Sequence, residues 1–426
     1  MYLSVSDWRS RKAAAGANPA AAVAFKTSPT VIALGVVSLL TDISSEAVAA
    51  VLPLYITGAL GLSMIVYGLF EGLHQSVSAL VRIGAGYAAD RGNHPKPIAV
   101  AGYGLSMLAR VGLLFATGFT GLMAVIGIDR IGKGIRTAPR DAMIQQASQP
   151  EHLARSFGLH RLLDTIGATL GPLLAFAVLV IIPDGYRVVF VLSLGAAVLG
   201  VAVLGLLVPN RTLHAGQVTA PAQTPVAPRP RLRLVLRGNL GRVLLVAGLL
   251  GLLTIGDGFV YLGLMSHGHL ETRWFPLLFV GSNAVFLLLA VPLGKLADRT
   301  SRAAMFVLGH LALALAYAAA ALGGSLVHVV ASLALLGTFY AATDGVLAAL
   351  AGQLSPTGST STSIGAAQTV VAVTRLLSAT GFGAAWMFFG AGSALLGAAM
   401  LLLLAIPCAW WLLLRTRAPR GRQVRA

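Results

Sequence analysis

The sequence predicts an all-α membrane protein with twelve transmembrane helices in two six-helix bundles. Of its 426 residues, 57% are hydrophobic and only 11% are charged, and the mean hydropathy is +0.82. A soluble chain of this size could not hide so much apolar surface, because its outer face must be wetted. Apolar windows of about 20 residues, the length that crosses a bilayer, recur along the chain. A polar segment in the middle divides them evenly, and the two halves share a repeated motif.

The apolar windows fall into two sets of six. The first set lies within residues 29–208 and the second within residues 241–414, and we interpret these ranges as the two bundles. Residues 209–240 between them are rich in Pro, Ala and Arg, and this composition predicts a flexible linker. The windows begin near Val31, Met64, Ile98, Gly121, Phe157 and Val188, and then near Val243, Trp274, Ala303, Leu326, Ile364 and Ser393.

Basic residues give the chain a formal net charge of +17 at pH 7. They cluster in residues 1–28, in the linker, in residues 415–426 and in alternate short loops, whereas the opposite loops hold chiefly Arg187 and Arg273. Basic loops stay in the cytoplasm, so we expect two cytoplasmic tails and a cytoplasmic linker. This placement argues against nucleic acid and predicts contact with anionic membrane lipids. The abundance of Ala, and of Arg over Lys, favours a bacterial inner membrane.

Several chemistries find no support in the sequence. There is no Walker loop, zinc-binding helix signature or nucleophile elbow, so neither an enzyme nor an ATP-driven pump is predicted. His267, His269 and Glu271 in an outer loop have side chains that suit a metal, but short loops of this kind are usually solvated. No metal or other cofactor is therefore predicted. Cys408, the single cysteine, is expected to be a packed residue of the last helix.

A repeated motif follows the second window of each half. The stretch GYAADRGNHPKP begins at residue 86, and GKLADRTSRAAM begins 208 positions later at residue 294. An offset of about half the chain indicates duplication, with the halves related by an axis along the membrane normal. A glycine lets two helices approach closely, and an aspartate can receive a helix N-terminus or an arginine. We therefore expect a cytoplasmic gate formed by Gly86, Asp90, Arg91, Asp298 and Arg299, although a plain basic turn is the simpler alternative.

Seven of the fourteen acidic residues fall inside the apolar windows: Asp42, Glu46, Glu71, Asp129, Asp164, Asp257 and Asp344. A charge in mid-bilayer costs roughly 2.5–3.5 kcal/mol, so these side chains must face a cavity, pair with cations or carry protons. Asp42 and Glu46 lie one helical turn apart, as do Glu71 and His74. The residues predicted to line the cavity and handle protons or cations are Asp42, Glu46, Glu71, His74, Arg110, Arg130, Asp257 and Arg375.

Two readings of the acids on the first helix stay open. A carboxyl group in an intermittently wet cavity can take up a proton on one side and release it on the other, which makes it a candidate coupling site. Alternatively, Asp42 or Glu46 is permanently neutralised by Arg130 or Arg110.

Together these features resemble the major facilitator superfamily over essentially the whole chain. Its loop motif of a glycine, an Asp-Arg pair, a further glycine and basic residues is met by Gly86, Asp90, Arg91, Gly92 and Lys96. Arg130 and Gly134 are similar to the superfamily's Arg-x-x-x-Gly signature on the fourth helix, where the arginine is associated with proton transfer. On the fifth helix, Gly167, Gly171 and Pro172 match the Gly-x-x-x-Gly-Pro core of a motif typical of its antiporters.

The resemblance implies a secondary transporter that acts as a monomer and works by alternating access. The antiporter-like motif implies proton-coupled efflux of a small organic solute, either a drug-like compound or a metabolite. One alternative is an importer or exchanger of an organic anion, because several arginines fall inside the windows. A second alternative, from another class, is a membrane enzyme or a receptor that carries no solute.

Overall fold

The computed structural model describes residues 28–91, 95–149, 152–210, 238–267, 270–355 and 360–414, and within these ranges the chain forms helices and connecting turns without strands. In the first half the elements are α2 (Pro29–Leu54), the π-helical turn η1 (Tyr55–Ala59), α3 (Met64–Arg91), α4 (Pro95–Phe115), α5 (Gly118–Gln146), α6 (Leu153–Ile181) and α7 (Tyr186–Leu207).

The second half contains four continuous spans and two interrupted ones. The elements are α9 (Asn239–Leu252), α10 (Asp257–Ser266), the short 3₁₀ turn η3 (Thr272–Trp274), α11 (Phe275–Arg299), α12 (Arg302–Leu322), α13 (Leu326–Thr343), α14 (Val346–Gln353), α15 (Thr360–Phe389) and α16 (Ala391–Leu414).

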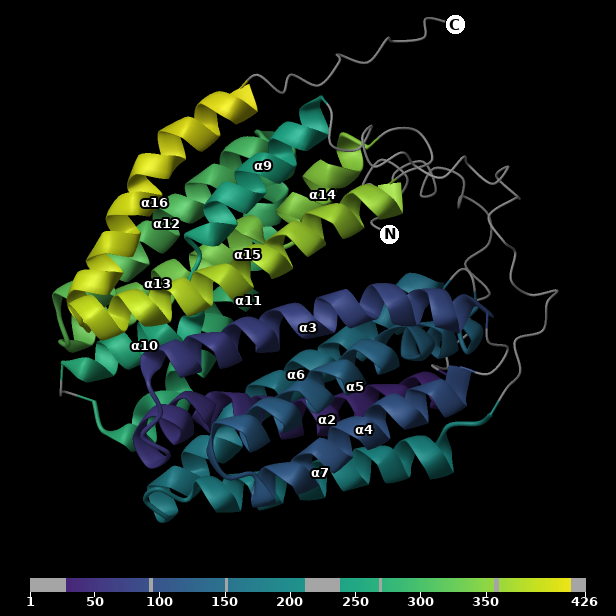
Figure 1. Ribbon diagram of the computed structural model, residues 1–426. Coiled ribbons are helices and arrows are strands. Elements are labelled where there is room, and N and C mark those ends of the chain that lie inside the picture. Colours follow the sequence, from purple (N-terminus) through teal and green to yellow (C-terminus); the bar gives the residue numbers. More distant parts are fainter. Residues whose placement is uncertain are drawn as a thin grey trace, which may run out of the picture.

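The described chain contains the twelve spans that the sequence predicts. Ten of them, counting α9 with α10 and α13 with α14 as single spans, are long and apolar enough to cross a membrane. The other two, α3 and α5, have 28 and 29 residues and carry more charge. Figure 1 shows the two bundles, with α2 to α7 in purple to teal and α9 to α16 in green to yellow.

The two bundles meet along α3 and α15, and along α6 and α11 (Figure 1). We call the end of the molecule where α7 ends and α9 begins the linker end, and the opposite end the far end. Among the described residues, close approaches between the halves lie toward the far end. A Cβ atom on Gly68 of α3 would lie 2.2 Å from the carbonyl oxygen of Ala379 on α15, and the Phe176 and Trp274 rings stack with centroids 5.4 Å apart.

The interrupted spans expose backbone groups that the protein itself satisfies. Between α9 and α10, the Ile255 amide donates to the Tyr317 hydroxyl at 2.9 Å, and the Thr254 carbonyl accepts from the Ser378 hydroxyl at 2.9 Å. Irregular backbone at membrane depth is tolerated only where protein or water satisfies it. The second interruption, between α13 and α14, falls at Asp344 and Gly345, and Gly345 has a left-handed φ of 74°.

The linker end of the first bundle is fastened by Lys96 at the start of α4. Its ammonium group donates to the carbonyls of Gly205 and Val208, at 2.8 and 2.5 Å. A cation suits this position, because the last carbonyls of a helix lack partners and carry partial negative charge.

Cys408 is exposed on α16, so the expectation of a packed cysteine was wrong. The last helix is apolar on every side, with a mean hydropathy of 2.2 over its span, and its sequence therefore does not distinguish the outward face from the packed face.

Candidate functional site

A buried ionic cluster lies in the first half, where α4 meets α5. The Asp129 carboxylate lies 3.1 Å from the Arg110 guanidinium and 2.6 Å from that of Arg130. Arg110 also donates to the Ser44 hydroxyl of α2, at 3.3 Å. All three charged side chains are about 95% buried. Sequence reasoning placed Asp129 at membrane depth without a role, although its position beside Arg130 is a signal that the two could pair.

This cluster decides one of the open readings. Arg110 and Arg130 pair with Asp129, and no ion pair joins either arginine to Asp42 or Glu46 among the described residues. In this structure, Arg110 and Arg130 therefore do not neutralise Asp42 or Glu46. The reason is geometric, because Asp129 lies on the same helix as Arg130 and directly against α4.

Asp42 and Glu46 instead lie among α2, α5 and α6. Glu46 Oε1 lies 3.8 Å from Lys133 Nζ, and both side chains are about one-third exposed, at 33% and 30%. The Asp42 carboxyl group is in hydrogen-bond contact with the carboxyl group of Asp164 on α6. Two carboxyl groups in contact repel each other when both are ionised, and a proton shared between them removes this repulsion.

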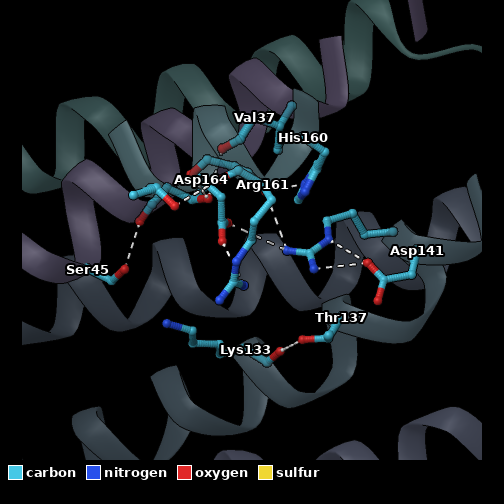
Figure 2. Close-up of polar contacts among 12 residues, drawn as sticks. Val37, Ser45, Lys133, Thr137, Asp141, His160, Arg161 and Asp164 are labelled. Atoms are coloured by element: carbon cyan, nitrogen blue, oxygen red, sulfur yellow. Dashed lines mark hydrogen bonds and ion pairs between the residues drawn. The ribbon is translucent and has the colours of Figure 1, made fainter. Parts of the chain in front are cut away.

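Asp164 also joins a network of cations, shown in Figure 2. It lies 3.4 Å from Arg161 and 4.0 Å from Arg140, and Arg140 in turn pairs with Asp141 at 2.9 Å. The His160 ring and the Ser38 hydroxyl form a 2.8 Å hydrogen bond beside it. The carboxyl pair of Asp42 and Asp164 is therefore bordered by positive charge.

A second cluster lies at the boundary between the halves. The Glu71 carboxylate on α3 accepts from Gln75 at 3.2 Å and fits against Gly256 of the α9–α10 break, where a Cβ atom would lie 2.6 Å from Glu71 Oε1. Asp257, the first residue of α10, accepts a 2.6 Å hydrogen bond from the Tyr340 hydroxyl. Arg375 of α15 is a charged neighbour of both carboxylates.

The eight residues predicted for the cavity therefore separate into two groups. Glu71 and His74 lie one turn apart, but the charged neighbours of His74 are Arg130, Lys133, Asp129 and Arg110 in the first half. The first-half group contains Asp42, Glu46, His74, Arg110 and Arg130. The boundary group contains Glu71, Asp257 and Arg375.

The predicted gate is described only in part. Gly86, Asp90 and Arg91 lie in the last turns of α3, and their side chains fall outside the described residues. Asp298 is exposed and pairs with Arg302 at 2.7 Å, and Arg302 also donates to Gln353 of α14 at 3.4 Å. Arg299 is exposed. The partners described for Asp298 and Arg302 therefore lie in their own half.

The glycines of the antiporter-like motif lie where α6 crosses α2. A Cβ atom on Gly167 would lie 2.4 Å from the Leu39 carbonyl oxygen, and one on Gly171 would lie 2.7 Å from the Ala47 amide nitrogen. Pro172 follows inside the same helix. Side chains at these two positions would push the two helices apart and displace Asp42 and Glu46 from α6.

The outer-loop residues that could suit a metal have other contacts. The His267 ring lies 3.2 Å from the Ala320 carbonyl oxygen, and Glu271 pairs with Arg273 at 2.8 Å. His269 lies outside the described residues.

The twelve-helix fold and its charged interior define a multi-pass membrane transporter rather than an enzyme. The family model of the Major Facilitator Superfamily matches residues 34–379. The chain belongs to this superfamily, and it is a secondary transporter of some small solute.

The chain is similar to proteins of an archaeon and of a mycobacterium. An MFS-type transporter of Methanocaldococcus jannaschii is 28% identical over 389 residues, covering 89% of this chain and 95% of the relative. A Mycobacterium tuberculosis protein is 27% identical over 285 residues, covering 65% of this chain and 68% of that protein.

Two crystal structures illustrate the shared fold. The nucleoside transporter NupG superposes with a TM-score of 0.77 at 13% identity, covering 90% of this chain and 98% of that one. An inward-facing bacterial homologue of the human lysosomal transporter Spinster has a TM-score of 0.73 at 17% identity, covering 92% and 98%. At these identities the likeness concerns the fold alone.

Proposed function

We propose that this protein is a proton-coupled antiporter that expels a small organic solute across a bacterial inner membrane. It acts as a monomer and alternates between a state open to the cytoplasm and a state open to the outside. The observation that carries the proposal is the contact between the carboxyl groups of Asp42 and Asp164, one turn from the Glu46–Lys133 pair.

The first-half group supplies the groups that exchange protons. The Asp42–Asp164 pair holds a proton while the two carboxyl groups are in contact, and it can release that proton when α2 and α6 shift relative to the cations around them. Arg140, 4.0 Å from Asp164, is one of the cations that such a shift would bring closer to the pair. Glu46 likewise takes up a proton when its ion pair with Lys133 breaks, and it releases that proton when the ion pair forms again. Arg130 stays bound to Asp129 and tunes the local field.

The boundary group links protonation to opening. Glu71 belongs to the first half, whereas Asp257 and Arg375 belong to the second. Any opening of the far end separates these charges and withdraws Glu71 from Gly256. Loss or gain of a proton on Glu71 or Asp257 therefore changes the free energy of that opening.

Orientation and direction rest on two further arguments. The basic linker and tails support a cytoplasmic position for the linker end. The tight contacts toward the far end then correspond to a closed outer side, so this conformation opens inward. Export is supported by the Gly167, Gly171 and Pro172 motif, which brings α6 close to α2 beside the coupling acids. Gly86, Asp90, Arg91, Asp298 and Arg299 are proposed to close the cytoplasmic side.

The test is proton movement in sealed proteoliposomes that contain a pH-sensitive dye. Uridine, ethidium and benzoate represent neutral, cationic and anionic solutes, each added under an imposed pH gradient. We expect at least one solute to drive proton movement in the wild type and to fail in Asp42→Asn, Glu46→Gln and Asp164→Asn.

The matched control is Asp184→Asn, which changes an acid in the loop before α7, where asparagine tolerates the φ of 56°. This variant should retain full activity. Solute-driven proton movement that is unaltered in all three site variants would remove these acids from the coupling role.

A further inference from the structure

A small polar pocket lies inside the first bundle, between α2, α4, α5 and α7. Five hydroxyl-bearing residues line it, together with the charged residues Arg110, Asp129, Lys133 and Arg136. Three cations therefore face one carboxylate. That carboxylate is already shared, because Asp129 binds both Arg110 and Arg130. The pocket consequently has an excess of positive charge.

Arg136 is the cation of the pocket that forms no direct ion pair among the described residues, and Asp129 and Asp42 are its more distant charged neighbours. Its side chain is 6% exposed, and its guanidinium carbon lies 4.5 Å from the centre of the Tyr103 ring. Among the described residues no carboxylate lies within 4.0 Å of it. A buried guanidinium without a direct ion pair carries a desolvation penalty, which an anionic ligand in contact with it would offset.

A buried polar atom next to this charge also lacks a partner among the described residues. The Tyr103 hydroxyl, on a side chain that is 1% exposed and lines the pocket, makes no hydrogen bond. Buried polar groups are nearly always hydrogen-bonded, and this hydroxyl can donate. A ligand group that accepts hydrogen bonds would satisfy Tyr103.

We propose that this pocket, whose free volume of about 10 Å³ has room for one water molecule in this conformation, widens during the transport cycle and binds the anionic group, a carboxylate or a phosphate, of the transported solute. The proposal rests on the proposed function, because it presumes that the chain carries a small organic solute. Arg136 and Tyr103 supply the inner contacts, as charge-assisted hydrogen bonds are the strongest available to such a group. Lys133 also lines the pocket, is 30% exposed and lies 3.8 Å from Glu46. The arriving anion competes with Glu46 for Lys133, and the displaced Glu46 is then free to take a proton.

The test measures thermal stabilisation of the purified full-length protein in lipid nanodiscs at constant ionic strength. The probes are sodium benzoate, succinate and glycerol 3-phosphate, each compared with its neutral counterpart, namely benzamide, succinamide and glycerol. At least one anion should raise the melting temperature in a saturable way while its counterpart does not. Equal shifts from each anion and its neutral counterpart, or the same shift from sodium chloride, would overturn the proposal.

Variants locate the binding. Tyr103→Phe removes only the hydroxyl and should weaken the anion about tenfold, the value of one hydrogen bond to a charged group. Arg136→Gln should weaken it at least tenfold. Arg187→Gln, an exposed charge at the start of α7, and Tyr55→Phe, outside the pocket, should bind as wild type. Unchanged affinity in both Tyr103→Phe and Arg136→Gln would overturn the site even if Arg136→Gln proves unstable, because Tyr103→Phe preserves the shape of the pocket.

The outcome separates this proposal from antiport. If proton movement follows only neutral or cationic solutes and is insensitive to Tyr103→Phe, the antiporter stands and the anion site falls. If anions bind and depend on Tyr103 but no solute moves protons, the anion site stands and the proton coupling falls.

Discussion

Asp129 and Arg130, adjacent on α5, form an ion pair in which Asp129 Oδ2 lies 2.6 Å from the Arg130 guanidinium. The other carboxylate oxygen, Asp129 Oδ1, lies 3.1 Å from the guanidinium of Arg110 on α4. The pair is therefore both local and a bridge between two helices. Both arginine side chains are about 95% buried, so the Asp129 carboxylate is what compensates the cost of burying their two positive charges.

The first prediction concerns that carboxylate. Asp129→Asn leaves two buried guanidinium groups without an anion and should destabilise the fold by about 3–5 kcal/mol. Asp298→Asn breaks an ion pair of similar length, 2.7 Å, but its side chain is 64% exposed, so the loss should stay within about 1 kcal/mol. Unfolding in mixed detergent micelles measures both. Equal losses would mean that Asp129 is not the counter-charge of Arg110 and Arg130.

The second prediction concerns the crossing of α6 and α2. Gly167→Ala places a methyl group 2.4 Å from the Leu39 carbonyl oxygen and should cost about 1–3 kcal/mol through overpacking. Gly158→Ala, on the same helix with nothing within 4 Å, should be neutral or slightly stabilising, since alanine favours helices. Thermal unfolding compares the pair, and solute-driven proton movement should fall only in Gly167→Ala.

The third prediction concerns the closed far end. Gly68→Ala brings a methyl group to 2.2 Å from the Ala379 carbonyl oxygen and forces α3 and α15 apart. Amide hydrogen exchange should therefore rise in residues 64–72 and 376–383. Gly381→Ala, on α15 with open space around it, should exchange as the wild type does. Equal protection in both variants would show that this contact does not hold the halves together.

The fourth prediction concerns Tyr340 and Asp257. Tyr340→Phe removes the 2.6 Å hydrogen bond to the carboxylate and should destabilise the protein by about 1–3 kcal/mol. Adding Asp257→Asn should recover part of the loss, because a neutral amide is easier to bury without a donor. A double-mutant cycle measures the coupling. Tyr186→Phe, which loses a 3.3 Å bond to Asp184 in a loop, is the control and should change stability little.

Local signals in the sequence were sufficient to predict the membrane-spanning helices, but they did not predict the breaks within two of the spans or the contacts between distant residues in the interior. Window lengths and loop charges gave the twelve spans, because crossing a bilayer requires a continuous apolar stretch. The α9–α10 and α13–α14 breaks were not predicted, although Gly256-Asp257-Gly258 and Asp344-Gly345 are turn-forming sequences. The contact of Glu71 with Gly256 joins residues 185 positions apart in different halves, and no local pattern encodes it.

The site shows the same division. Their spacing predicts that Glu71 and His74 share one face of α3. In the structure Glu71 belongs to the boundary group and His74 to the first-half group, because α3 lies where the two halves meet. The adjacency of Asp129 and Arg130 indicated one ion pair, but spacing gave no reason to choose Asp129 over Asp42 or Glu46 as the partner of Arg110. That choice follows from the packing of α4 against α5, which a single sequence does not specify.

The interruptions of α9–α10 and α13–α14 both belong to the second half, whereas α2 and α5 of the first half run through without a break. Hinges form most easily where the backbone ladder is already open, so bending during the transport cycle should concentrate at Thr254–Gly256 and Asp344–Gly345. Asp129 and Lys96 fasten α4, α5 and α7 of the first bundle to one another, so these three helices should move as one unit while α2 and α6 shift against them. The two copies of an ancestral unit would then deform in different ways, the second by bending within its spans and the first by movement between its helices.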